Sequence, residues 1–189
     1  MLIWRHQTSG VRMANKGKLM DMLTAYAASH QHRLNIAVHM IGIPTIMFGA
    51  LIPLSWASVT VGGVDINMAY IVMLGFFAFY LTLDRVFAVV FLILAMVIAA
   101  LSGIVAELPL RTSGTIAALA FAGGYVAQFI GHAVEKSMPV LVKHPVQANL
   151  AAPFFTVVEM FKILGLRDEL FNEVQAQILE RREQESGTA

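Results

Sequence analysis

The polar residues that could carry chemistry gather in two short stretches, each at one end of a long apolar block. The first stretch leads into an apolar block and contains His30, His32, Arg33, Asn35 and His39. The second stretch closes a later block and contains Gln128, His132, Glu135 and Lys136. Polar side chains are costly at membrane depth, so histidines in such positions usually have a partner or a function. The two stretches are therefore the candidate site.

Spacing decides which side chains of the first stretch can meet. His32, Asn35 and His39 would form one stripe on a continuous helix, because residues three and four apart share a face. His30 would point away from that stripe, unless the chain around residues 32–34 bends or starts a new helix. Spacing alone therefore favours His32 over His30 as the partner of His39.

Three residues of the second stretch share one helical face. His132 and Glu135 are three apart, and Gln128 lies four before His132. Imidazole suits iron, zinc and copper, and a neighbouring carboxylate can ligate the metal or orient a histidine. We expect Asn35 and Gln128 to support the ligands, since amides ligate first-row metals poorly. Histidines that only form hydrogen bonds between helices are the alternative.

Composition identifies the kind of scaffold that must position these residues. The chain has 189 residues, of which 58% are hydrophobic and 13% charged, and its mean hydropathy is +0.70. Soluble domains carry about 25% charged residues, so the composition predicts a membrane protein. A net charge of +1 excludes the strongly basic surface of a nucleic-acid-binding protein. The absence of cysteine excludes disulfides, thiolate nucleophiles and metal sites held by cysteine.

Four apolar blocks approach the roughly 20 residues that one helical crossing needs. They cover Ile36–Trp56, Ile66–Thr82, Val86–Ala106 and Gly114–Val134. Lys and Arg precede the first block and follow the fourth, which predicts that both termini are cytoplasmic. The sequence thus predicts an all-α integral membrane protein with about four crossings, in which both polar stretches reach the cytoplasmic face.

The chain divides into three expected parts. Residues 1–25 are an N-terminal cytosolic segment, residues 26–165 form the membrane domain with the histidine-rich site, and residues 166–189 form a C-terminal amphipathic helix and tail. Within the membrane domain, Leu150–Gly165 is apolar but contains Pro153, Glu159 and Lys162, which predicts an interfacial or half-inserted helix. Asp168–Glu185 repeats apolar residues at helical spacing, which is typical of an amphipathic helix.

Three stretches resemble the signatures of the 2-hydroxy fatty acid dioxygenase family. Tyr26–Pro44 contains a His, an Asn five residues on and a His four further, followed by Gly and Pro. Gln128–Leu141 contains Gly131-His132 and Pro139, and Leu150–Glu159 resembles the third signature. The resemblance extends from Tyr26 to about Phe161.

This resemblance implies an Fe(II)-dependent oxidoreductase that uses molecular oxygen to shorten a long-chain 2-hydroxy fatty acid by one carbon, in fatty acid α-oxidation. It assigns His30, His39 and His132 as the catalytic and metal-binding histidines, and so reverses the choice that spacing makes between His30 and His32. The acidic residue of the second signature falls at Glu135, which is a fourth candidate ligand.

The expected partners are the 2-hydroxy fatty acid and membrane lipid, without nucleic acid, and a homo-oligomer is compatible with the sequence. The membrane is expected to be a bacterial inner membrane or the endoplasmic reticulum.

Three other functions would use the same residues. A bis-histidine haem protein would use His39 and His132 as axial ligands. A zinc-dependent membrane hydrolase would use the same ligands without oxygen. A structural or transport protein would use the histidines for hydrogen bonds between helices and would carry no metal.

Overall fold

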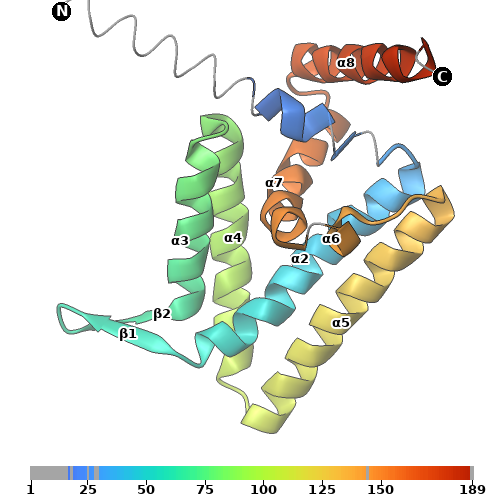
Figure 1. The fold of residues 1–189 in the computed structure, drawn as a ribbon. Helices are drawn as coiled ribbons and strands as arrows, with labels where there is room; N and C mark the ends of the chain where they lie inside the picture. The colour runs from blue at the N-terminus through green and yellow to red at the C-terminus, as the bar shows by residue number, and fades with distance from the viewer. Residues whose placement is uncertain (1–16, 18, 25, 28–29, 144, 188–189) are drawn as a thin grey trace, which may run out of the picture.

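The computed structural model describes residues 17, 19–24, 26–27, 30–143 and 145–187, and this part of the chain is almost entirely helical (Figure 1). Residues 19–24 form a short helical stretch. The helices that follow are α2 (Arg33–Ser55), α3 (Met68–Leu81), α4 (Arg85–Ala106), α5 (Leu110–Glu135), α6 (Val140–Lys143), α7 (Pro145–Ile163) and α8 (Asp168–Gly187). Most of the expected N-terminal segment, residues 1–25, lies outside the described residues.

Three of these helices, α2, α4 and α5, are long and apolar enough to cross a membrane. The second predicted crossing forms α3, which has 14 residues and is about 21 Å long, shorter than the roughly 30 Å hydrocarbon core. Helices α7 and α8 are long and apolar enough to cross a membrane only if the two count as one broken span, with a bend of 111° between them. The all-α membrane fold is therefore confirmed, with three to four helices of spanning character.

The connection between α2 and α3 is extended rather than helical. It is an antiparallel hairpin of β1 (Ser58–Val61) and β2 (Val64–Asn67), with Val61 paired to Val64. Gly62 and Gly63 have φ angles of +59° and +82°, as a two-residue hairpin turn with positive φ at both positions requires. The β-branched residues on both sides favour the extended conformation.

Helices α2 and α5 lie side by side because small residues line their contact (Figure 1). A Cβ atom added at Gly49 would lie 2.5 Å from the Phe121 backbone nitrogen, and one added at Gly124 would lie 2.5 Å from Ile46 Cγ1. Gly131 likewise faces Asn35. Small residues allow two helix backbones to approach closely. This α2–α5 seam brings the first polar stretch beside the second.

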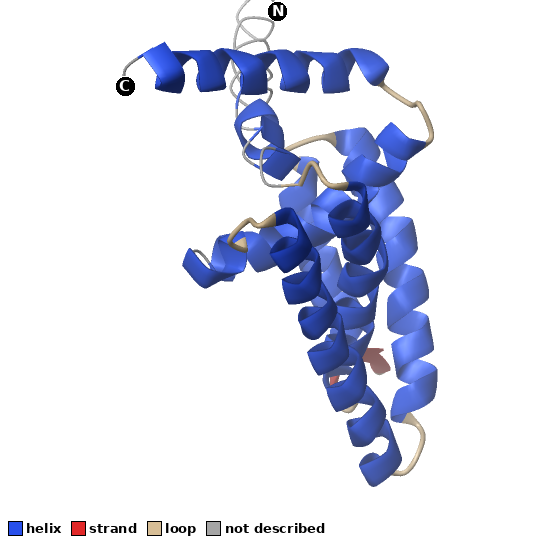
Figure 2. Ribbon diagram, turned by 90° about the vertical axis from the view of Figure 1, so that its right-hand side faces the viewer, coloured by secondary structure: helices blue, strands red, loops and turns tan. Residues whose placement is uncertain are grey.

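Helix α7 is packed into the bundle. Residues 153–159 of this helix are all buried, and Phe154 lies in an aromatic cluster with Tyr80, Phe87 and Phe91. The Tyr80 hydroxyl donates to the Leu150 carbonyl at 2.7 Å and fixes the start of this buried stretch against α3. Figure 2 shows the chain turning after α7, so that α8, which carries the C-terminus, lies across one end of the bundle.

Candidate metal centre

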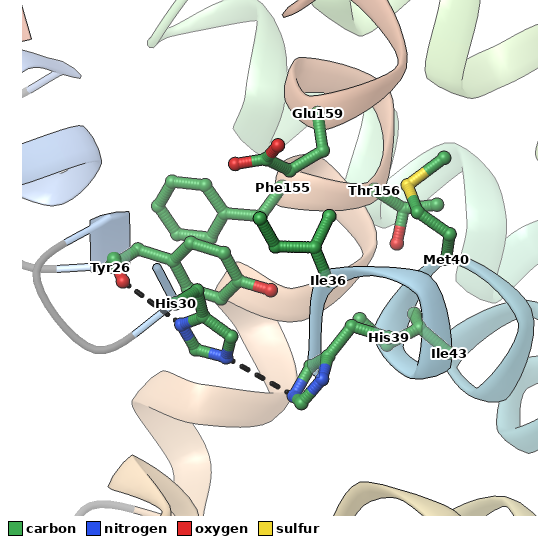
Figure 3. Close-up of a pocket in the computed structure, with 9 residues that line it drawn as sticks. All are labelled: Tyr26, His30, Ile36, His39, Met40, Ile43, Phe155, Thr156 and Glu159. Carbon is green, nitrogen blue, oxygen red and sulfur yellow. Dashed lines mark hydrogen bonds between the residues drawn. The ribbon is translucent and has the colours of Figure 1, made fainter. Parts of the chain in front are cut away.

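Three buried histidines, His30, His39 and His132, converge on one point. Their facing ring nitrogens all lie within 4.8 Å of one another, and Nε2 of His30 lies 3.1 Å from Nε2 of His39 (Figure 3). The three side chains are 3%, 8% and 4% exposed. We call these residues the histidine triad. They come from the segment before α2, from α2 and from α5, so the triad exists only in the folded chain.

A bend before α2 decides which histidine joins His39. Helix α2 begins at Arg33, and His32 adopts an extended conformation with φ −79° and ψ 126°. The His32 ring is exposed, and its Nδ1 accepts a hydrogen bond from the Leu34 backbone nitrogen at 3.2 Å. The continuous stripe that would place His32 beside His39 is therefore not formed, and His30 takes that place.

In each imidazole of the triad, the ring nitrogen Nδ1 lies within hydrogen-bond distance of an oxygen atom. Nδ1 of His30 lies 2.9 Å from the Tyr26 carbonyl oxygen, and Nδ1 of His39 lies 2.9 Å from the Asn35 carbonyl oxygen. Nδ1 of His132 lies 2.9 Å from the Ser137 hydroxyl. Because a carbonyl oxygen can only accept, the first two rings carry their proton on Nδ1 when neutral. Their Nε2 lone pairs then face each other across 3.1 Å.

The triad could hold a cation between its rings. Two facing lone pairs repel each other, and a shared proton or a metal ion removes that repulsion. Burial, together with the neighbouring His39 ring, lowers the pKa of His30 to about 3, so protonation of His30 is unfavourable at physiological pH. Neutral imidazoles with an orienting hydrogen bond at the second nitrogen are the usual form of histidine metal ligands. The donor set therefore fits iron, zinc or copper.

An aromatic stack holds His30, which lies outside any helix. The Tyr26 ring packs on the His30 ring with centroids 3.8 Å apart, and Phe155 of α7 covers the other face of Tyr26 at 3.8 Å (Figure 3). The sequence reasoning missed the support from Tyr26, Phe155 and Ser137. For Tyr26, the available signal was its position four residues before the candidate ligand His30. Nothing in the sequence pointed to Phe155.

Glu135 is near the triad but is not part of it. Its Oε1 accepts hydrogen bonds from the backbone nitrogens of Gln31, at 2.6 Å, and His32, at 3.2 Å. Its Oε2 accepts a hydrogen bond from Nδ2 of Asn35. A carboxylate at the start of a helix is also favoured by the helix dipole. Glu135 thus ties the end of α5 to the bend that positions His30.

Asn35 and Gln128 are both buried beside the triad. Asn35 presents its backbone carbonyl to His39 and its side-chain amide to Glu135. Gln128 is 8% exposed, and its Nε2 is buried without a hydrogen-bond partner among the described residues. A cavity of about 630 Å³ begins at the triad and is lined mostly by apolar side chains of α2, α3, α5 and α7, with Gln128, Tyr125 and Asn149 among its polar lining residues.

The sequence comparisons identify the family. Residues 17–163 match the family model described as 2-hydroxy-palmitic acid dioxygenase Mpo1-like. No curated protein and no solved structure matches the chain. The matched range contains the whole triad, the α2–α5 seam and α7, and it covers well over half of the chain. The chain belongs to the Mpo1-like family.

Proposed function

We propose that this protein is an Fe(II)-dependent membrane dioxygenase that shortens long-chain 2-hydroxy fatty acids by one carbon. The family supports the reaction class. The observation that carries the metal assignment is the convergence of three buried imidazoles, two of which have their lone pairs directed at each other by carbonyl groups. The chain contains no cysteine that could compete for the ion.

In this proposal His30, His39 and His132 hold the iron. Three nitrogen ligands leave positions for a substrate and for oxygen, as non-haem iron oxygenases require. Fe(II) supplies the redox chemistry that oxygen activation needs. Glu135 acts as a positioning residue, because both of its oxygens already accept hydrogen bonds from the start of α2.

The other residues of the site hold the ligands and shape the space around them. Tyr26 and Asn35 keep the two imidazoles in the form that can ligate a metal, because each offers a carbonyl oxygen to Nδ1. The Tyr26–Phe155 stack restricts rotation of His30. The apolar walls of the cavity exclude water from the reacting end of the substrate and accept its tail.

Oxygen uptake by the full chain tests the reaction. Anaerobically purified protein supplied with Fe(II) is expected to consume oxygen with 2-hydroxyhexadecanoic acid and to release pentadecanoic acid, carbon dioxide and water, with the carboxyl carbon leaving as carbon dioxide. Unhydroxylated hexadecanoic acid is the matched control and is expected to be inert, since it lacks the hydroxyl oxygen next to the carboxylate. Equal turnover of the two acids, or equal turnover by iron-free protein loaded with zinc, would contradict the proposed function.

A further inference from the structure

The cavity that begins at the triad follows one face of α2. The residues of α2 that line it recur one helical turn apart, singly or as adjacent pairs, as a single helical face requires: His39, Ile43, Ile46, Met47, Ala50, Leu51 and Leu54. His39 and Leu54 are fifteen residues apart, and at about 1.5 Å per residue the lined face is about 22 Å long. The cavity is therefore elongated, with the triad at one end.

The two ends of this lined face differ in polarity. The three imidazoles and the side chain of Gln128 line the cavity at the His39 end. Other polar lining residues come from elements outside α2, and two of them are paired, because the Tyr125 hydroxyl donates to Oδ1 of Asn149 at 2.6 Å. Beyond Ile43, α2 contributes only apolar side chains, and Val72, Met73 and Phe76 of α3 are apolar as well. An amphiphile with a small polar head and a hydrocarbon tail matches the lining from α2 and α3 in one orientation only. Its head lies at the triad and its tail points toward Leu54.

The length of the lined face matches a tail of palmitic size. An extended alkyl chain advances about 1.25 Å per carbon, given C–C bonds of about 1.5 Å and near-tetrahedral angles. Sixteen carbons therefore reach about 19 Å, which ends between Ala50 and Leu54 when the head lies beside His39. At about 1.5 Å per residue, Ala50 stands about 16 Å from His39, and its methyl group leaves the cavity open where a larger side chain would close it.

We infer that this cavity is the acyl-chain site and that Ala50, with Leu54 beyond it, limits the length of the chain that fits. The inference rests on the proposed function for the nature of the head group. Ala50→Phe is expected to close the cavity at about the thirteenth carbon. Chains of sixteen carbons then lose the burial of several methylene groups, which weakens their binding roughly tenfold or more. Chains of ten or twelve carbons keep their site.

Photolabelling tests the acyl-chain site without requiring catalytic turnover. The probe is hexadecanoic acid with a diazirine at carbon 10, applied to the full-length, iron-free chain in lipid nanodiscs. The tenth carbon is expected about 11 Å from the head, so the label should fall on Ile46 or Met47 and should be displaced by 2-hydroxyhexadecanoic acid. Ala50→Phe should reduce this labelling roughly tenfold. Ala122→Phe, at an exposed position of α5 outside the cavity, should not change it.

The chain-length profile of oxygen uptake is the second readout. Ala50→Phe is expected to shift the preferred 2-hydroxy acid from sixteen carbons to twelve or fewer, whereas Ala122→Phe keeps the wild-type profile. Labelling at Ile46 or Met47 in a protein that turns over no acid supports the acyl-chain site and contradicts only the proposed function. Labelling confined to outward-facing residues, or the same labelling and chain-length preference in Ala50→Phe as in the wild type, overturns the acyl-chain site even if the enzyme is active.

Discussion

Local hydrogen bonds orient each imidazole of the triad. The oxygens that hold Nδ1 belong to Tyr26, four residues before His30, to Asn35, four residues before His39, and to Ser137, five residues after His132. Ring orientation is therefore decided close to each histidine in the sequence. Only the convergence of the three rings depends on the fold. The Tyr26 and Asn35 oxygens are backbone carbonyls, so Ser137 is the residue of the three whose oxygen a substitution removes, and Ser137→Ala should weaken metal binding without moving the helices.

Also at the residue scale, a substitution of Glu135 distinguishes a metal ligand from a residue that only positions the bend before α2. If it positions the bend before α2, Glu135→Gln should keep most of the iron, because one side-chain oxygen still accepts from the backbone nitrogens of Gln31 and His32. The variant should lose about 1–2 kcal/mol of stability, since hydrogen bonds to a charged group become neutral ones. Iron analysis and thermal unfolding in detergent measure the two effects. Loss of the iron with unchanged stability would instead identify Glu135 as a ligand.

At the scale of the elements, the close contact of α2 and α5 is what places His39 beside His132. Gly124 packs against Ile46 and the Gly42 carbonyl, whereas a Cβ atom at the neighbouring Gly123 would meet no described atom within 4 Å. The two glycines are adjacent on one helix and differ only in whether they face the seam. They form a matched pair for testing whether the seam positions the triad.

Gly124→Ala should force α2 and α5 apart and cost about 1–3 kcal/mol of stability, as overpacking does in well-packed interiors. It should also weaken iron binding, because His39 and His132 stand on opposite sides of the seam. Gly123→Ala should leave iron binding unchanged and keep or raise stability, since alanine favours helix. Thermal unfolding measures the stability of the two variants, and iron titration measures their affinity for iron. Equal effects of the two substitutions would mean that the seam does not position the triad.

Much of the fold follows from the sequence, because membrane helices obey simple length and polarity rules. The blocks Ile36–Trp56 and Val86–Ala106 become α2 and α4 with small changes at their ends, and the fourth block extends to α5. The hairpin of residues 58–67 was missed because its strands have only four residues each, too few for a clear alternation. The burial of α7 was missed because it depends on tertiary contacts to α3 and α4.

Less of the candidate site than of the fold could be predicted from the sequence. The two polar stretches and their common membrane face followed from the positions of the apolar blocks. The choice of His30 over His32 could not be made from spacing, because spacing arguments assume a continuous helix. The bend before Arg33 depends on capping by His32 and on hydrogen bonds to Glu135. Only the family resemblance selected His30. The Tyr26–Phe155 stack joins residues far apart in sequence and has no pattern that spacing could detect.

At the scale of the whole molecule, the distribution of Lys and Arg predicts that the termini share one side of the membrane and that the β1–β2 hairpin lies on the other. The chain has no cysteine, so single cysteines can report each position. Val64→Cys, at an exposed hairpin position, should resist a membrane-impermeant thiol reagent applied to the cytoplasmic side, whereas Ala189→Cys should react. Reaction of both cysteines from the same side would contradict this topology.

The most direct test of the histidine triad is metal analysis of the full-length chain purified without oxygen, combined with optical spectra. The wild type and His32→Ala are expected to contain about one iron per chain, and His30→Ala, His39→Ala and His132→Ala to lose most of it, since each of these three substitutions removes one of only three proposed ligands. Circular dichroism should show unchanged helix content in all variants, because the apolar packing remains. Iron that survives in the triad variants but is lost in His32→Ala, stoichiometric zinc in place of iron, or a haem Soret band would contradict the assignment.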